Sequence, residues 1–149
     1  MSAQWPKRDP IRNCSLLPND LFSLGLSSGE IAVYSYLLRC EDRKTHQCWP
    51  SYKTIGKAVK MSRKTVQKYV AMLEDKRLIA TEQTTVQRRN GRKQNGNLLY
   101  TIRPIREALE HFHERQMAKL ERTAAIHHAK EQAVKRGVEF HPADTEQTA

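Results

Sequence analysis

The chain has 149 residues, about the length of one domain, and 38% of them are hydrophobic, which indicates a small core. Twenty-six Lys and Arg against 16 Asp and Glu give a formal net charge of +10, which indicates an anionic partner such as nucleic acid. No run of about 18 apolar residues occurs, so no membrane-spanning helix is expected. Three irregularly spaced cysteines favour reduced thiols in a cytoplasmic protein.

Residues 1–17 are polar, contain two prolines and lack the apolar segment of a signal peptide. We expect a flexible arm here, either a loose tail or a basic arm that reaches a neighbouring nucleic-acid groove. The motif Pro18-Asn19-Asp20 then precedes Leu21 and Phe22, which predicts a helical turn that packs on the domain.

The first long helix is predicted to begin at Ser27-Ser28, with Glu30 near its start, and to end near Arg39 to Glu41. Its apolar residues lie almost all round the helix, which is typical of a helix in the centre of a domain. They are Ile31, Val33, Tyr34, Tyr36, Leu37 and Leu38.

A charged loop, residues 41–47, follows this helix, and Trp49 is expected in a short strand against the base of a hairpin. Cys40, His46 and Cys48 are three candidate metal ligands, whereas a structural zinc site needs four. The four histidines at 111, 113, 127 and 128 include no i, i+4 pair on one helix face. The sequence therefore predicts no metal site and no cofactor.

Two short helices joined by a tight turn come next. Ser51 is expected to cap the first, whose inner face is Ile55, Ala58 and Val59. Only Lys60-Met61 separates it from Ser62, the predicted cap of the second helix. This arrangement is a helix-turn-helix, a motif whose second helix enters the major groove of DNA.

The second helix has an apolar stripe made of Val66, Tyr69, Val70 and Leu73. Cations in its first turn oppose the helix dipole, which indicates that phosphates bind there. The expected DNA contacts of this helix are Ser62, Arg63, Lys64, Thr65, Gln67 and Lys68. Arg63 and Gln67 suit base edges, because Arg can fork to guanine and Gln to adenine. The expected contacts to the DNA backbone are Ser51, Tyr52, Lys53, Thr54 and Lys60.

A β-hairpin is predicted from a strand at residues 78–86 and a returning strand at 98–102. The polar, basic segment between them contains two Asn-Gly pairs, which are turn signals. Its expected DNA-contacting residues are Arg88, Arg89, Asn90, Arg92 and Lys93. Residues 60–95 contain ten Lys and Arg against three Asp and Glu, so a net +7 gathers on the second helix and the hairpin.

Pro104 predicts the start of a C-terminal helix over residues 104–136, followed by a disordered tail at 137–149. Its apolar stripe either covers the first long helix or forms the seam of a homodimer, and the helix could also recruit a replication or transcription partner. The candidate dimer residues are Leu109, Phe112, Met117 and Leu120.

The order of these elements resembles a winged helix-turn-helix domain over residues 18–103, which implies a mainly α fold with a small antiparallel β-hairpin and a C-terminal helix. The sharpest resemblance lies in three segments, Trp49–Gly56, Met61–Val66 and Leu73–Ile79. They are similar to the small winged-helix family carried by plasmids, phages and integrative elements of Gram-positive bacteria, and to N-terminal domains of plasmid replication initiators. Lys60 and Arg77 depart from that pattern, because glycine is frequent at both positions.

The resemblance implies that the helix from Ser62 reads the major groove and that the hairpin tip reaches phosphates or the minor groove. We expect a double-stranded DNA-binding protein, a transcriptional regulator that acts by occupancy without a small-molecule ligand. The alternatives are a replication or transfer factor of a mobile element and a winged helix that binds proteins. No nucleophile–base pairing, carboxylate cluster or phosphate loop occurs, so no enzymatic activity is expected.

Overall fold

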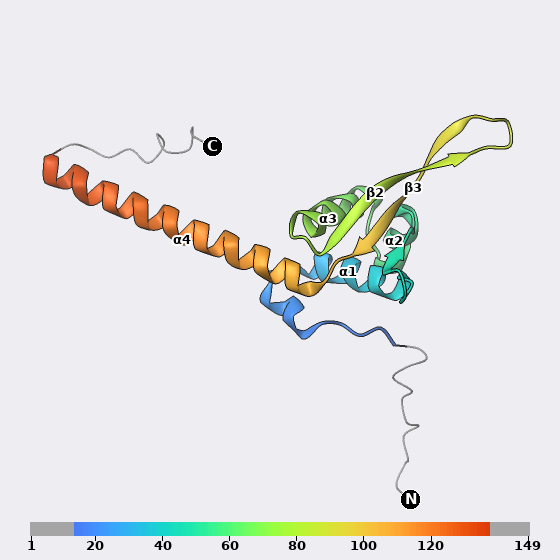
Figure 1. The fold of residues 1–149 in the computed structure, drawn as a ribbon, viewed down its shortest axis with the longest axis horizontal. Helices are drawn as coiled ribbons and strands as arrows, with labels where there is room; N and C mark the ends of the chain where they lie inside the picture. The colour runs from blue at the N-terminus through green and yellow to red at the C-terminus, as the bar shows by residue number, and fades with distance from the viewer. Residues whose placement is uncertain (1–13, 138–149) are drawn as a thin grey trace, which may run out of the picture. The chain divides into compact units, whose positions relative to one another are not determined.

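The computed structural model describes residues 14–137, so the expectations for residues 1–13 and 138–149 lie outside the described part of the chain. The elements in chain order are the 3-10 helix η1 (Asn19–Ser23), helix α1 (Ser28–Cys40), strand β1 (Gln47–Cys48), helices α2 (Tyr52–Val59) and α3 (Arg63–Asp75), strands β2 (Ile79–Gln87) and β3 (Lys93–Ile102), and helix α4 (Ile105–Arg136) (Figure 1). The expected fold class, a winged helix-turn-helix with a C-terminal helix, is confirmed. The chain forms two compact units, of which the first ends at Leu109 and the second begins at Glu110, within α4.

Helix α1 begins with a capping box. The Glu30 backbone N–H donates to Ser27 Oγ, and the Ser27 N–H donates to Glu30 Oε2 at 2.7 Å, so each residue satisfies an amide of the other. Val33, Tyr34 and Leu37 are buried. The other three apolar side chains of the helix, Ile31, Tyr36 and Leu38, are half-buried. α1 packs against α2, α3 and β3, which confirms its predicted central position.

Helices α2 and α3 form the helix-turn-helix. The turn requires Lys60 in the left-handed region (φ 58°, ψ 47°), and a Cβ on the buried Gly56 would lie 2.5 Å from the Met61 carbonyl oxygen. The predicted inner face of α2 is partly wrong, because Ile55 is buried and Val59 half-buried, whereas Ala58 is exposed. Gly56 takes the place of Ala58, since this side of α2 must approach the backbone of the turn closely.

The apolar stripe of α3 is confirmed. Val66, Val70 and Leu73 are buried, and the half-buried ring of Tyr69 lies against Gly29, where an added Cβ would be 2.3 Å from Tyr69 Cζ. This contact lets α1 and α3 approach closely. After α3 the chain turns through Arg77, which is also left-handed, with φ 59°.

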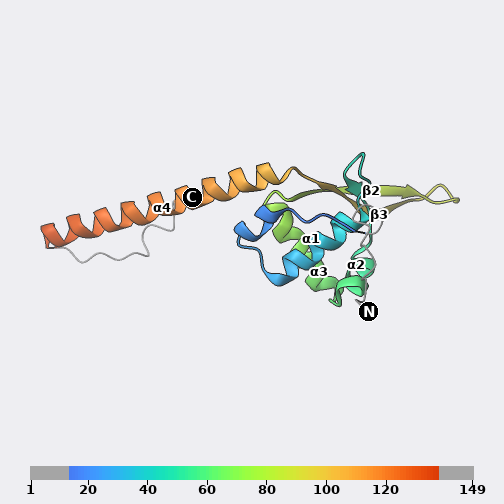
Figure 2. The same cartoon turned by 90° about the horizontal axis from the view of Figure 1, so that it is seen from below.

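The three strands form an antiparallel sheet in the order β1-β3-β2, with Cys48 opposite Tyr100 and Ile79 opposite Ile102. Within the first unit, helices α1, α2 and α3 lie on one side of this sheet (Figure 2). The expectation for Trp49 is wrong, because β1 ends at Cys48 and Trp49 follows it with 63% of its surface exposed. Cys48 instead supplies the buried side chain of β1.

The hairpin is longer than predicted, because β3 begins at Lys93, paired with Gln87. Asn90-Gly91 forms the turn, with φ 76° at Gly91. The expectation of a second turn at Asn95-Gly96 is wrong, since both residues belong to β3. Between the pairs Gln83–Leu98 and Thr85–Asn95, β3 contains one residue more than β2, which is a β-bulge.

Helix α4 runs from Ile105 to Arg136, and Gly137 follows it with φ 69°, in agreement with the predicted helix and its end. Leu109 and Phe112 are half-buried, whereas Met117 and Leu120 are 58% and 62% exposed. Within residues 14–137, no helix has the length and apolar character needed to cross a membrane.

Candidate nucleic-acid interface

The first turn of α3 carries most of the residues that the sequence predicted for base contacts. Ser62 Oγ accepts the Thr65 N–H at 3.3 Å and lies 2.8 Å from Thr65 Oγ1, so these two hydroxyls fix the start of the helix. The side chains of Arg63, Lys64, Gln67 and Lys68 are exposed, opposite the buried stripe. The helix thus presents three cations and an amide to solvent.

Helix α2 begins in the same way, with Ser51 Oγ accepting the Thr54 N–H at 3.1 Å and lying 2.9 Å from Thr54 Oγ1. Lys53 is exposed and Tyr52 is half-buried. Burial raises the pKa of the Tyr52 phenol, the carboxylate of Glu74 raises it further, and Arg63 opposes this shift. These electrostatic effects place Tyr52 beside the start of α3.

A groove with a volume of about 590 Å³ joins the two helices to the base of the wing, the hairpin β2–β3. From α2 and the segment before it come Pro50, Ser51, Tyr52 and Lys53, from α3 Arg63 and Gln67, and from the wing Gln83, Asn95, Gly96, Asn97, Leu98 and Tyr100. The groove brings together both residues predicted to read bases and three of those predicted to contact the DNA backbone.

The tip of the wing carries the predicted cations. The Arg88 N–H donates to the Arg92 carbonyl at 2.9 Å, and the Gly91 N–H donates to the Arg88 carbonyl at 2.9 Å. Asn90 Oδ1 accepts the Arg92 N–H at 3.3 Å, so this side chain stabilises the turn. Arg88, Arg89, Arg92 and Lys93 are all exposed at the tip, apart from the groove at the base.

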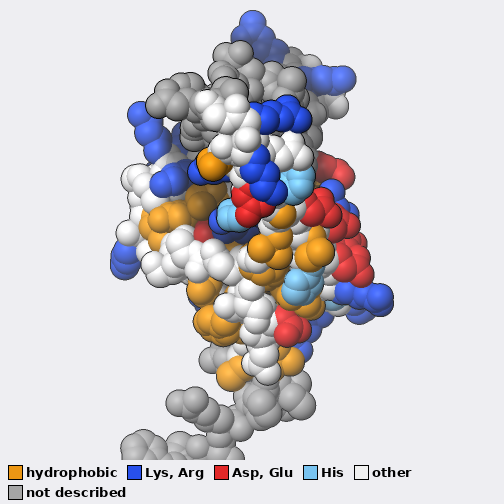
Figure 3. Space-filling view, turned by 90° about the vertical axis from the view of Figure 1, so that its left-hand side faces the viewer, with side chains coloured by type: hydrophobic (Ala, Val, Ile, Leu, Met, Phe, Trp, Pro, Cys, Tyr) orange, Lys and Arg blue, Asp and Glu red, His pale blue; other side chains and the backbone are white. Residues whose placement is uncertain are grey.

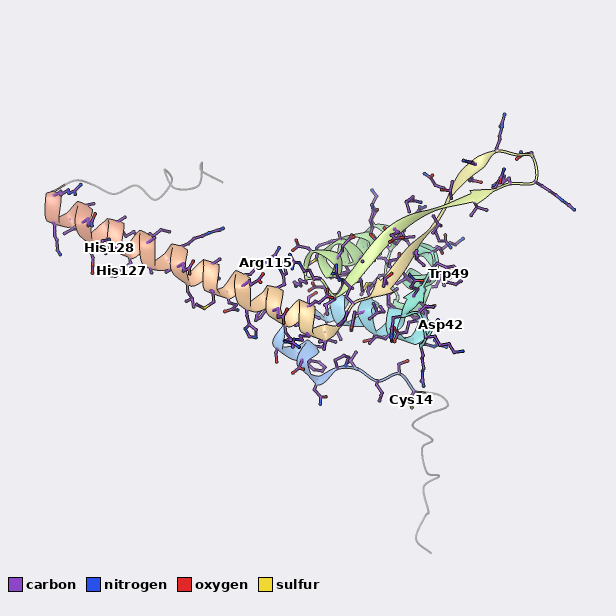
Figure 4. All side chains as sticks on the ribbon, in the orientation of Figure 1. Cys14, Asp42, Trp49, Arg115, His127 and His128 are labelled. Atoms are coloured by element: carbon purple, nitrogen blue, oxygen red, sulfur yellow. The ribbon has the colours of Figure 1, made fainter. Side chains whose placement is uncertain are left out.

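Sequence reasoning missed three amides that line the groove, Gln83, Asn95 and Asn97. The signal was the Asn95-Gly96 pair, which marks a β-bulge as well as a turn. Asn97 Nδ2 donates to the Trp49 carbonyl at 3.2 Å, which ties the wing to the segment before α2. Trp49 itself lies beside the wing base and remains exposed (Figure 4).

Two left-handed residues flank the helix-turn-helix. Lys60 and Arg77 have φ 58° and 59°, and both side chains are exposed. An L-residue in this conformation costs about 1–2 kcal/mol relative to the right-handed region. Both positions could therefore hold glycine, and the cations instead add to the basic surface around α3.

The thiols do not form a metal centre. Among residues 14–137, no group of three or more His, Cys, Asp or Glu is placed to hold a metal ion. Burial raises the pKa of Cys48 to about 12, and its Sγ donates to the Leu37 carbonyl at 3.7 Å. Cys48 is therefore a neutral core residue at physiological pH.

The face shown in Figure 3 differs from this basic surface, because hydrophobic side chains on it are interspersed with acidic, basic and histidine side chains. A surface of mixed charge does not produce the single-signed field that attracts a polyanion. The cations predicted for DNA gather instead on α3 and the wing.

Residues 24–79 match the family model of a helix-turn-helix domain. No curated protein matches the chain. Two solved structures are similar to it. One is described as a "possible transcriptional regulator" from Methanosarcina mazei Go1, with 20% identity, a TM-score of 0.46, and coverage of 70% of this chain and 81% of that chain. The other is a MarR family transcription regulator, with 17% identity, a TM-score of 0.38, and coverage of 86% and 79%.

Proposed function

We propose that the chain is a sequence-specific, double-stranded DNA-binding protein that regulates transcription by occupying its site, without a small-molecule ligand and without catalytic activity. In this proposal α3 enters the major groove, Arg63 and Gln67 contact base edges, and Lys64 and Lys68 contact phosphates. The starts of α2 and α3 hold the sugar–phosphate backbone, and the wing tip binds an adjacent stretch of it. The protein acts in the cytoplasm, where its DNA lies.

The observation that carries this proposal is the groove. Arg63 and Gln67 of α3 line it together with Ser51 and Lys53 at the start of α2 and with the wing base. A helix that reads bases needs neighbouring contacts to fix its register on the duplex. The net +7 of residues 60–95 supplies the electrostatic attraction to phosphates that DNA binding requires.

A replication or transfer factor of a mobile element would use the same DNA contacts and would recruit partners through α4. This alternative keeps the resemblance to plasmid and phage proteins. It differs from a regulator in the position of the bound site, which would lie at an origin of replication or transfer. A winged helix that binds proteins is less well supported, because the exposed side of α3 is basic.

The test is selection of duplexes from a random-sequence DNA library by the full chain, followed by affinity measurements on the selected duplex and on a scrambled one. We expect the selected site to bind at least about 10³-fold more tightly. Equal affinity for both duplexes would show that the protein binds DNA without reading sequence. Failure to bind either duplex at low salt would overturn the proposed function.

A further inference from the structure

We propose that the amides at the base of the wing, Gln83 and Asn95, are DNA-contacting residues that add affinity independent of salt, separately from the cationic wing tip. This inference rests on the proposed DNA-binding function and deepens it. It assigns to the groove between α3 and the wing one strand of the DNA duplex, held by uncharged hydrogen bonds.

The β-bulge is the first reason. Side chains of a regular strand alternate between its two faces, so neighbouring residues cannot all face one groove. The extra residue in β3 interrupts this alternation, and Asn95, Gly96, Asn97 and Leu98 all line the same groove. Bulges commonly redirect a side chain at a functional site.

The bulge is held in place by specific contacts. Gln83 Nε2 donates to the Gly96 carbonyl at 3.0 Å, and Thr84 Oγ1 donates to the Asn97 carbonyl. A Cβ at position 96 would lie 2.6 Å from Thr84 Oγ1, so glycine lets the two strands approach here. Asn97 Nδ2 joins the bulge to the Trp49 carbonyl, and Asn97 is therefore a positioning residue.

The composition of the groove is the second reason. Its wing side contains the three amides and no Lys or Arg, whereas its opposite side contains Lys53, Arg63 and Gln67. Gln83 and Asn95 are exposed, and an amide can donate to a phosphate oxygen or to a base acceptor. A DNA strand between α3 and the wing would thus meet cations and Gln67 on one side and neutral donors on the other.

Charge separates the two parts of the wing in an experiment. A cation at a phosphate releases condensed counterions, so its loss lowers the dependence of affinity on salt. A neutral amide releases none, so its loss lowers affinity equally at every salt concentration. Gln83 and Asn95 should therefore affect affinity alone, whereas the tip should affect both affinity and the salt slope.

The experiment uses the full chain and the duplex selected by the wild type, with fluorescence anisotropy over a range of salt concentrations. We expect Gln83→Ala and Asn95→Ala each to weaken binding about tenfold, as one lost hydrogen bond to a charged group allows, with an unchanged slope of log affinity against log salt. Gln94→Ala is the matched control, because Gln94 is an exposed amide next to Asn95 that does not line the groove. It should bind like the wild type.

Wild-type affinity in both groove variants, or an equal loss in Gln94→Ala, would overturn the inference. A slope that falls by about 0.9 would also overturn it, because it would mean that a phosphate contact of a cation had been lost. Thermal unfolding of each variant confirms that it is folded. Absence of DNA binding by the wild type would instead count against the proposed function, so the two failures are distinct.

Discussion

Lys76 Nζ donates to Glu30 Oε1 at 2.7 Å and thereby joins the end of α3 to the start of α1. Glu30 is the one charged residue among residues 14–137 that is fully buried, and its other oxygen, Oε2, accepts the Ser27 N–H. The carboxylate therefore caps α1 and holds α3 at the same time. The orientation of the proposed recognition helix depends on this ion pair.

Replacing Lys76 with Met should destabilise the protein by about 3 kcal/mol, because it leaves a buried carboxylate without its counter-charge. The change in the free energy of unfolding is measured by urea denaturation at neutral pH. Lys64→Met is the matched control, since Lys64 is exposed on the same helix, and its effect should stay within about 0.5 kcal/mol. Equal stability of the two variants would show that the ion pair contributes nothing.

The same pair makes stability depend on pH. Burial raises the pKa of Glu30, but the hydrogen bonds from Lys76 and Ser27 outweigh burial, and the pKa lies below its ordinary value of 4.5. The contribution of Glu30 to stability is therefore present above the unfolded pKa and is lost as the pH falls through the lowered folded pKa. In Lys76→Met, burial dominates and raises the pKa, so protonation stabilises that variant. The stability difference between wild type and Lys76→Met should narrow between about pH 5 and pH 3, whereas a constant difference would contradict this assignment.

Local sequence signals predicted the helices because each start has its own chemistry. Ser27, Ser51 and Ser62 all accept a backbone N–H in the structure, as expected for N-caps. The apolar spacing of α3 likewise fixed which of its sides is buried. The ion pair of Glu30 with Lys76 could not be predicted, because the two residues are 46 positions apart and only tertiary packing brings them together.

The wing shows the opposite case, in which a local signal has two physical outcomes. Asn-Gly favours a turn and also a bulge, and the choice depends on strand register. The pairing of Gln87 with Lys93 closes the hairpin at Asn90-Gly91 and leaves Asn95-Gly96 inside β3. For this reason the sequence predicted the cationic tip of the wing but missed the amides at its base.

Replacing Arg63 or Gln67 with Ala should relax specificity at one base pair, by about 1–3 kcal/mol for each residue. Both side chains are exposed on α3 and line the groove, so little loss of stability is expected. The measurement compares affinities for the selected duplex and for duplexes that differ from it by one base pair. A uniform loss of affinity on every duplex would mean that the two residues contact phosphates only.

Neutralising the wing tip by replacing Arg88, Arg89, Arg92 and Lys93 with Gln should weaken binding to every duplex. These side chains are exposed around the turn, and each lost phosphate contact should reduce the slope of log affinity against log salt by up to about 0.9. Asn90 stays unchanged, because its side chain stabilises the turn. An unchanged slope would show that the tip does not contact DNA.

The apolar stripe of α4 is proposed to form the seam of a homodimer, which would double the length of the DNA site that is read. Met117 and Leu120 are large, exposed side chains within the second compact unit, and apolar surface of this kind favours association. Met117→Glu combined with Leu120→Glu should place charges in the seam and convert a dimer into a monomer in sedimentation experiments at micromolar concentration.

Ala125→Glu is the control for this prediction, because Ala125 is exposed on α4 and lies about 140° around the helix from Leu120, at 3.6 residues per turn. This variant should remain dimeric and keep its affinity for a palindromic site, whereas the double variant should lose affinity there and keep it for a single half-site. A wild-type chain that sediments as a monomer at the same concentration would refute the dimer. Loss of the dimer in both variants would show that added charge on α4, rather than the apolar seam, disrupts association.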